Sequence, residues 1–121
     1  MTGGALHADM RICDYRHVMR DDVRLDEAAE LFRALASPVR VGLLLELTDG
    51  ERCVHDLVDA LGVAQPLVSQ HLRILRAADL VVGSRRGREV VYTLRDDHIA
   101  HIVRDAVHHV SEPVDAAGAI A

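Results

Sequence analysis

Residues 54–78 constrain the fold most, because two helical apolar patterns follow each other there with almost no space between them. The first pattern is short, at about residues 54–61, and Gly62 follows it where a left-handed residue is favoured after a helix. Ala64-Gln65-Pro66 begins the second helix, which ends near Ala78. Its predicted inner face consists of Leu67, Val68, Leu72, Ile74 and Leu75. The sequence therefore predicts two short helices joined by a tight turn.

Two β-rich segments follow the helix pair directly. Leu80-Val81-Val82 and Val90-Val91-Tyr92-Thr93-Leu94 are predicted as strands. Between them, Ser84-Arg85-Arg86-Gly87-Arg88 supplies a glycine for the turn and a basic tip for the hairpin. A helix pair followed by a hairpin is the layout of a winged helix-turn-helix. The expected fold class is therefore mainly α with a β-hairpin wing (α+β).

Further helices on either side complete the predicted domain. One covers residues 25–35, and the next begins at Ser37-Pro38, an N-cap followed by proline, and ends at Thr48-Asp49-Gly50. A last helix spans about residues 96–111 and is stopped by Pro113. A length of 121 residues favours one domain. The expected parts are an amino-terminal arm at residues 1–24, partly disordered or a short helix, a winged helix-turn-helix domain at residues 25–112, and a flexible tail at residues 113–121.

Aliphatic side chains must form the core, since hydrophobic residues make up 50% of the chain and aromatic residues only 2%. No apolar run approaches the roughly 18–20 residues needed to cross a bilayer, and the amino terminus lacks the pattern of a signal peptide. The two cysteines, Cys13 and Cys53, are too few for a disulfide framework. We therefore expect a cytoplasmic protein with no membrane partner and with both thiols free for metal or redox chemistry.

Positive charge is confined to one stretch of the sequence. The net charge of −5 by itself argues against a nucleic-acid binder, and all 14 basic residues are arginines. Counted in segments, residues 1–63 carry −5, residues 64–95 carry +4, and residues 96–121 carry −4. A polyanion should therefore be contacted by residues 64–95.

The same basic stretch carries side chains suited to reading DNA. Glutamine and serine bond to base edges, and arginine pairs with guanine, holds phosphate or enters a narrow minor groove. The predicted DNA contacts are Gln65, Ser69, Gln70, Arg73, Arg85, Arg86 and Arg88. The alternative, in which these are ordinary solvated side chains, does not explain why charge, helix pair and hairpin coincide. Double-stranded DNA is the expected partner.

A polar stripe on the last predicted helix has the composition of a metal site. His98 and His109 lie on one side of the helix but eleven residues, or about 16 Å, apart, so one ion cannot bind both in one chain. An antiparallel copy of the helix places the donors of one end opposite those of the other. The predicted ligands are Asp96, His98, His109 and Glu112, with His101 as an auxiliary donor. The spacing predicts a homodimer with two equivalent sites for Zn²⁺, or for Co²⁺ or Ni²⁺.

A second group of donors is less regular. Cys13 and His17 are four residues apart, and Cys53-Val54-His55-Asp56 offers a thiolate, an imidazole and a carboxylate. Together they suit a sulfur-containing site of the kind that Zn²⁺, Cd²⁺ or Pb²⁺ accept. The alternative is that Cys53 is a small core residue and Cys13 lies in a disordered segment. The sequence leaves both interpretations open.

At this point the chain resembles the ArsR/SmtB family of metal-sensing repressors, and within it the zinc-sensing SmtB-like branch. The resemblance covers about residues 25–112. It is carried by Ala34-Leu35-Ala36-Ser37-Pro38-Val39-Arg40, by Glu51-Arg52-Cys53-Val54-His55-Asp56-Leu57, by Val68-Ser69-Gln70-His71-Leu72, and by the Asp-x-His and His-x-x-Glu pattern of the last helix.

The resemblance implies roles for the two donor groups. By motif, the ligands of the regulatory zinc are Asp96, His98, His109 and Glu112, and a second site joins Cys13 and His17 of one chain to Cys53 and Asp56 of the other. His55 stands where some members have a second cysteine, so it substitutes for Asp56 or assists it. The implied function is a metal-responsive repressor that binds an inverted-repeat operator as an apo homodimer and is released by Zn²⁺.

Other functions account for less of the sequence. A thiol-sensing winged-helix repressor would use Cys13 and Cys53 as a reversible disulfide, and it is the alternative that we retain. A zinc hydrolase is not expected, because four protein ligands would close the position that catalysis needs. We therefore predict that the protein is not an enzyme. A winged helix that binds only proteins is disfavoured by the basic segment.

Overall fold

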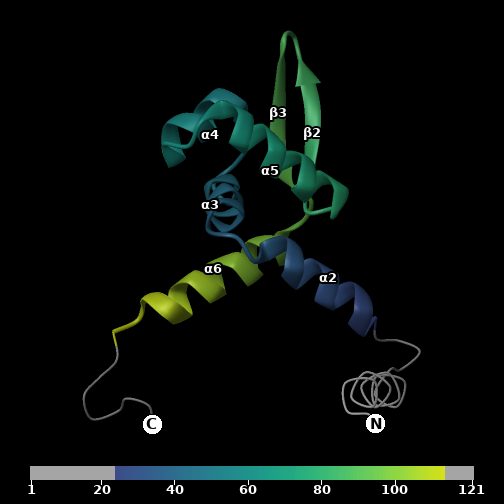
Figure 1. Ribbon diagram of the computed structural model, residues 1–121, viewed down its shortest axis with the longest axis vertical. Coiled ribbons are helices and arrows are strands. Elements are labelled where there is room, and N and C mark those ends of the chain that lie inside the picture. Colours follow the sequence, from purple (N-terminus) through teal and green to yellow (C-terminus); the bar gives the residue numbers. More distant parts are fainter. Residues whose placement is uncertain (1–23, 114–121) are drawn as a thin grey trace, which may run out of the picture. The chain divides into compact units, whose positions relative to one another are not determined.

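The computed structural model describes residues 24–113. In this part of the chain, five α-helices and three strands follow in the order α2, α3, β1, α4, α5, β2, β3 and α6 (Figure 1). The chain divides into two compact units, of which one ends at Arg33 and the other begins at Ala34. Nearly all of the predicted arm, with Cys13 and His17, and nearly all of the predicted tail lie outside the described residues.

Helix α2 (Leu25–Leu35) has the range that the sequence predicted. Asp26 and Glu27 lie in its first turn and Arg33 in its last, which is the arrangement that the helix dipole favours. Arg24 pairs with Glu27 at 3.3 Å on the exposed surface. Exposed pairs of this kind contribute only a few tenths of a kcal/mol each, so local charge supports the helix weakly.

Helix α3 (Pro38–Leu47) begins at the predicted cap. The Ser37 hydroxyl accepts a hydrogen bond from the Arg40 backbone N–H at 3.3 Å, and Pro38 occupies the first turn, where its missing N–H costs nothing. Thr48 ends the helix. Its leucines are largely buried, which places α3 in the centre of the core.

Helices α4 (Val54–Leu61) and α5 (Gln65–Ala77) form the predicted helix pair. Gly62, directly after α4, has a φ of +66°, a left-handed conformation in which a side chain would be strained. The short link turns the chain so that α4 and α5 contact each other, and α3 packs against both. The helix-turn-helix prediction is confirmed.

The wing, defined as strands β2 (Val81–Arg86) and β3 (Glu89–Leu94), follows α5. A short strand that the sequence did not predict, β1 (Arg52–Cys53), pairs with the other side of β3, and the sheet order is β1-β3-β2. Cys53 lies opposite Val91 in this antiparallel ladder. The wing is therefore joined to the residue that directly precedes α4.

The tip of the wing is shorter than predicted. Arg86 pairs with Glu89 across the hairpin, so only Gly87 and Arg88 form the loop. Gly87 has a φ of +63°, as two-residue hairpin loops require. The prediction that residues 84–86 belong to the turn is wrong, because one left-handed glycine suffices and the flanking residues continue the ladder.

Helix α6 (Asp97–Ser111) is capped by Asp96, whose carboxylate accepts a hydrogen bond from the Ile99 backbone N–H at 3.2 Å. Ile99 and Val103 are buried, whereas Val110 in the last turn is 78% exposed. Within the unit that begins at Ala34, the first half of α6 therefore packs against the core and the second half leaves apolar side chains open.

The core is aliphatic, as the composition predicts. Its buried residues are Ala34, Leu43, Leu44, Leu47, Leu57, Val68, Leu72, Leu75, Leu80, Val81, Tyr92, Ile99, Ala100 and Val103. Tyr92 is the one aromatic residue among them. Within residues 24–113, no helix has both the length and the apolar character required to cross a membrane.

The buried face of α5 is narrower than predicted. Val68, Leu72 and Leu75 are almost completely buried. Leu67 and Ile74, which the sequence analysis assigned to the same face, are 47% and 37% exposed, so that assignment is wrong. Each is one position away from a buried residue, and one position rotates a side chain about 100° around the helix. The two residues share a separate, exposed side of α5.

Two leucine variants of α5 test this arrangement. We expect Leu72→Ala to lower the free energy of unfolding by about 2–5 kcal/mol, because it leaves a cavity in the core. Leu67→Ala should cost less than about 1 kcal/mol, because nearly half of that side chain already contacts water. Urea denaturation at one fixed protein concentration measures both values. Equal losses would show that the two side chains are buried alike.

Candidate functional site

The outward side of α5 carries the predicted base-reading residues. Gln65, Gln70 and Arg73 are exposed, and Ser69 is half-buried. Because the buried face is held in the core, these polar side chains remain available to a ligand outside the protein. Ser69 presents less of its surface than the sequence implied.

The wing places its arginines differently from one another. Arg85 and Arg88 are exposed near the tip. Arg86 is exposed too, but it donates two hydrogen bonds to the Glu51 carboxylate, at 2.6 and 2.9 Å. This bidentate pair neutralises the Arg86 charge, so the wing offers fewer free cations than the sequence suggested.

The recognition surface, defined as the exposed residues of α5 and of the wing, is continuous in the fold. Helix α5 contacts β2, and Figure 1 shows α5 beside the upright hairpin. Glu51, which pairs with Arg86, precedes β1 on the other side of the sheet. Helix α5 and the wing, which carry most of the segment with positive net charge, are therefore neighbours in the fold.

A half-buried contact that the sequence did not predict joins α3 to α5. The Arg40 guanidinium lies with Nη1 3.2 Å from Nδ1 of His71, and its Nε donates to the Ala34 carbonyl at 2.6 Å. Arginine has no acceptor, so Nδ1 of His71 accepts and the imidazole proton sits on Nε2. The contact fixes α5 against α3. Its partners are 31 residues apart in the sequence, so no local pattern reveals it.

The predicted donors of α6 lie at its two ends and are exposed. At the beginning, Nδ1 of His98 is 3.7 Å from an Asp96 carboxylate oxygen, and the His98 side chain is 91% exposed. His109 and Glu112 lie at the other end. Within the described part of one chain, no group of three or more His, Cys, Asp or Glu side chains is close enough to hold a metal ion. Each end therefore brings together only part of the predicted donor set.

The carboxyl end of α6 differs from the predicted pattern in one contact. Nε2 of His108 is 3.2 Å from a Glu112 carboxylate oxygen, as the i to i+4 spacing allows. The sequence analysis gave His108 no role. In one chain, His108 rather than His109 is therefore the imidazole beside Glu112.

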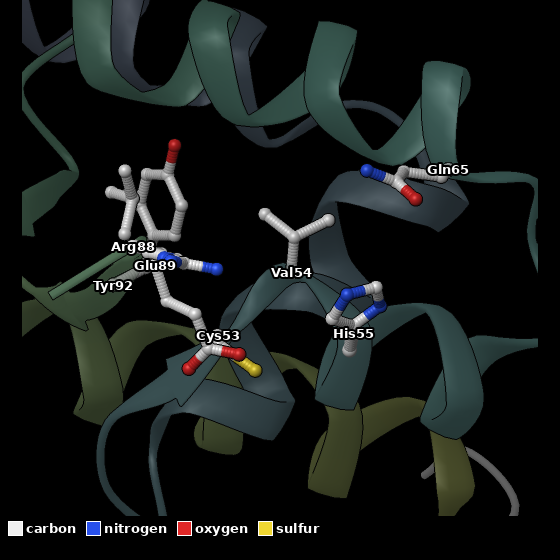
Figure 2. A pocket seen from close by; sticks show the side chains of 8 residues that line it. Cys53, Val54, His55, Gln65, Arg88, Glu89 and Tyr92 are labelled. Carbon is white, nitrogen blue, oxygen red and sulfur yellow. The ribbon is translucent and has the colours of Figure 1, made fainter. Parts of the chain in front are cut away.

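Cys53, His55, Gln65 and Arg88 line one open pocket of about 210 Å³, together with Val54, Glu89, Val90 and Tyr92. Figure 2 shows Gln65 above His55 on one side of Val54, with Arg88, Glu89 and Tyr92 on the other. Residues predicted for the second metal site and for DNA contact therefore surround the same hollow. The sequence spacing gave no sign of this.

The second donor group is only partly described. Cys53 is half-buried and has a free thiol, and its backbone N–H donates to the Asp56 carboxylate at 3.3 Å. Asp56 thus stabilises the first turn of α4, which is a structural role independent of any metal. His55 is exposed nearby. Cys13 and His17, the predicted partners of Cys53, lie outside the described residues.

Comparisons with known proteins agree with this fold. Residues 37–82 match the family described as "Bacterial regulatory protein, arsR family". The chain is 64% identical over 88 residues to the HTH-type transcriptional repressor SmtB of Mycobacterium tuberculosis, an alignment that covers 73% of this chain and 65% of that protein. The chain therefore spans slightly less than two thirds of that relative's length. A transcriptional repressor SmtB homolog of Synechocystis is 40% identical over 115 residues, covering 86% of this chain and 87% of its own.

A solved structure with a similar fold is described as a winged helix. The domain of Mb0332 from Mycobacterium bovis, described as a homodimeric winged helix-turn-helix DNA-binding domain, matches with a TM-score of 0.67 and 26% identity over 78% of this chain and 92% of that one. These relatives are named as regulators, not enzymes. The protein thus has a winged helix-turn-helix fold, and the chain belongs to the arsR family of bacterial regulatory proteins.

Proposed function

We propose that the protein is a metal-responsive transcriptional repressor whose homodimer binds operator DNA and is released by Zn²⁺. The observation that carries the DNA part is the recognition surface. Exposed amide and arginine side chains of α5 adjoin the exposed arginines of the wing, in a chain that is otherwise acidic. A helix with base-reading side chains beside a basic hairpin suits a major groove and the neighbouring backbone. Such a protein acts in the cytoplasm, where the operator is.

The homodimer follows from the two ends of α6. The donors at each end are exposed, and about 16 Å of helix separates them. A second copy in antiparallel orientation supplies the missing half at both ends. The apolar side chains that the second half of α6 leaves open, such as Val110, give that copy a surface to cover. The relative from Mycobacterium bovis, described as homodimeric, supports a dimer. An inverted-repeat operator then matches the two-fold symmetry of the protein.

The donors at the ends of α6 fit a borderline metal. Asp96, His98, His109 and Glu112 would hold it, with His101 nearby, and two imidazoles with two carboxylates suit Zn²⁺ and also accept Co²⁺ or Ni²⁺. When bound, the metal would neutralise the carboxylates of Asp96 and Glu112, and these ligands would come from two helices. If the dimer conformation that the metal favours binds DNA weakly, linkage requires metal and DNA to weaken each other by the same factor.

The Cys53 region supports a second, sulfur-containing site for Zn²⁺, Cd²⁺ or Pb²⁺, with Cys13 and His17 as further donors. A thiol switch between Cys13 and Cys53 is less favoured as the function. It would leave the paired donors of α6 without a role, and the strong similarity to repressors named SmtB fits the metal function better. If variants that lack Cys13 and Cys53 still release DNA normally when Zn²⁺ is added, the metal function is favoured over the thiol switch.

A DNA-binding titration with and without Zn²⁺ tests the proposed function. We expect Zn²⁺ to weaken binding of the protein to its operator by about 5- to 150-fold, the usual range of allosteric coupling. His98→Asn and His109→Asn should each abolish the effect while leaving metal-free binding unchanged. Fluorescence anisotropy of an operator duplex measures both affinities.

His108→Asn is the matched control for the histidine variants, since it changes an exposed imidazole on the same turn as His109. It should keep the response to Zn²⁺, and it should bind Zn²⁺ slightly more tightly because it releases Glu112. A response that survives in both His98→Asn and His109→Asn, or one lost in His108→Asn, contradicts the proposed ligand set.

Two variants of Asp96 separate its cap from its role as a ligand. Asp96→Ala should lower the free energy of unfolding by about 1 kcal/mol, because the Ile99 N–H loses its acceptor. Asp96→Asn should cost almost nothing, because asparagine caps equally well. Both should weaken Zn²⁺ binding, as neither retains the carboxylate. Thermal unfolding and a Zn²⁺ titration give the two readouts. Normal Zn²⁺ affinity in Asp96→Asn would exclude this carboxylate from the site.

We expect the three wing arginines to contribute unequally to the salt dependence of DNA binding. In a plot of the logarithm of the DNA-binding constant against the logarithm of the salt concentration, Arg85→Gln and Arg88→Gln should each reduce the slope by about 1. The reason is that each variant removes a phosphate contact. Arg86→Gln should reduce the slope by clearly less, because Glu51 already neutralises that charge. Glu51→Gln should make the slope steeper by releasing Arg86. Equal effects of the three arginine variants would show that the pair with Glu51 breaks when DNA binds.

A further inference from the structure

Three exposed side chains form a stripe along α5 that mixes apolar and amide groups. Leu67, Gln70 and Ile74 follow at i, i+3 and i+7, so they lie on one side of the helix. Leu67 is 47% exposed and Ile74 is 37% exposed, although both are large aliphatic residues. Gln70 between them is exposed as well.

The surroundings of this stripe point to DNA as the surface that covers it. Arg73 and Arg76 are exposed on the same helix, and the exposed Arg85 belongs to the adjoining β2. A protein partner for such an apolar stripe would have to bury these cations. A duplex supplies phosphates for the arginines, and its major groove presents apolar groups as well as hydrogen-bonding edges.

An A·T pair has groups that match both kinds of side chain. Glutamine bonds to N6 and N7 of adenine, and the C5-methyl of thymine makes apolar contacts. Leu67 and Gln70 are three residues apart, about 4.5 Å along the helix axis, which is close to the 3.4 Å rise of one base pair. The two side chains can therefore serve the same or adjacent A·T pairs.

Position along α5 distinguishes the two aliphatic residues. Leu67 lies in the first turn of the helix, which begins at Gln65, and Ile74 lies two turns further on. Side chains near the N-terminus of a recognition helix contact the base edges, so Leu67 lies closer to them than Ile74 does. Leu67 is therefore the residue placed to reach a thymine methyl.

We propose that Leu67 determines sequence specificity by contacting the methyl group of a thymine in each operator half-site, beside an adenine bound by Gln70. This rests on the proposed operator binding and adds the base composition that the operator must have. Every half-site should contain an A·T pair at which the methyl group contributes to affinity.

Deoxyuridine substitution tests the proposal, because it removes only the methyl group. Duplexes that bind the full-length protein are first selected from a random-sequence pool, and each thymine of the consensus is then replaced in turn. Removing a contacted methyl should weaken binding about fourfold per half-site, the effect of losing one buried methyl-sized group. Leu67→Ala should bind the unmodified duplex more weakly by a similar or larger factor and should not respond to deoxyuridine at that thymine.

Ile74→Ala is the matched control, as it removes another exposed aliphatic side chain from the same side of α5. It should keep the wild-type sensitivity to deoxyuridine. Because Leu67 is half exposed, Leu67→Ala should remain folded, and circular dichroism checks this. A second readout is the base preference of Gln70→Ala, which should bind with a weaker preference for adenine. If the protein selects a duplex but no thymine methyl matters, or if Leu67→Ala responds like the wild type, the proposal is wrong while operator binding stands. If no duplex is selected, the proposed function itself fails.

Discussion

Burial of one narrow side of α5 is the constraint on which the recognition surface depends. Val68, Leu72 and Leu75 are held in the core, and this fixes the rotation of the helix about its own axis. Every other position of α5 then has a determined direction. If α5 were rotated about its axis by one residue position, about 100°, Leu67 and Ile74 would become buried and side chains that belong to the core would become exposed. The Arg40–His71 contact reinforces the same orientation from the side of α3.

In the proposed function, the metal ligands at the ends of α6 require a second chain. Each end of one chain carries only some of the four predicted ligands. At one end, Asp96 caps the helix and lies beside His98, and the proposed function adds the role of a metal ligand. At the other end, Glu112 contacts His108, so a metal that recruits Glu112 must first displace an imidazole. In the proposed function, this competition lowers the affinity of the metal site, because the contact between His108 and Glu112 forms within each chain.

Sequence rules succeeded where the cause is local. The cap at Ser37 and the left-handed Gly62 each depend on a few neighbouring residues, and both have the predicted conformation. The helix-turn-helix and the hairpin followed from the same rules.

The sequence did not predict features that depend on distant partners. Glu51 and Arg86 are 35 residues apart, so no local pattern indicated that a carboxylate pairs with a wing arginine predicted to contact DNA. Leu67 and Ile74 fit a helical apolar pattern, but the core packs only against the narrower buried face of α5, which does not include them. The shared pocket of Cys53 and Gln65 arises because β1 joins the wing, and a strand of two residues is too short to recognise in a sequence. Whether the donors of α6 meet across two chains stays a prediction.

The pairing of β1 with β3 has a consequence for the length of DNA that one subunit spans. Arg52 and Cys53 belong to the sheet of the wing, and α4 begins at Val54, so no flexible linker separates the hairpin from the helix pair. The distance between α5 and the wing tip is therefore set by the fold. On a duplex, one extra base pair between the two contacted regions moves one of them about 3.4 Å along the axis and roughly 34° around it. In the proposed function, the wing would follow that displacement only by bending, so half-sites of different length would be distinguished by spacing as well as by sequence.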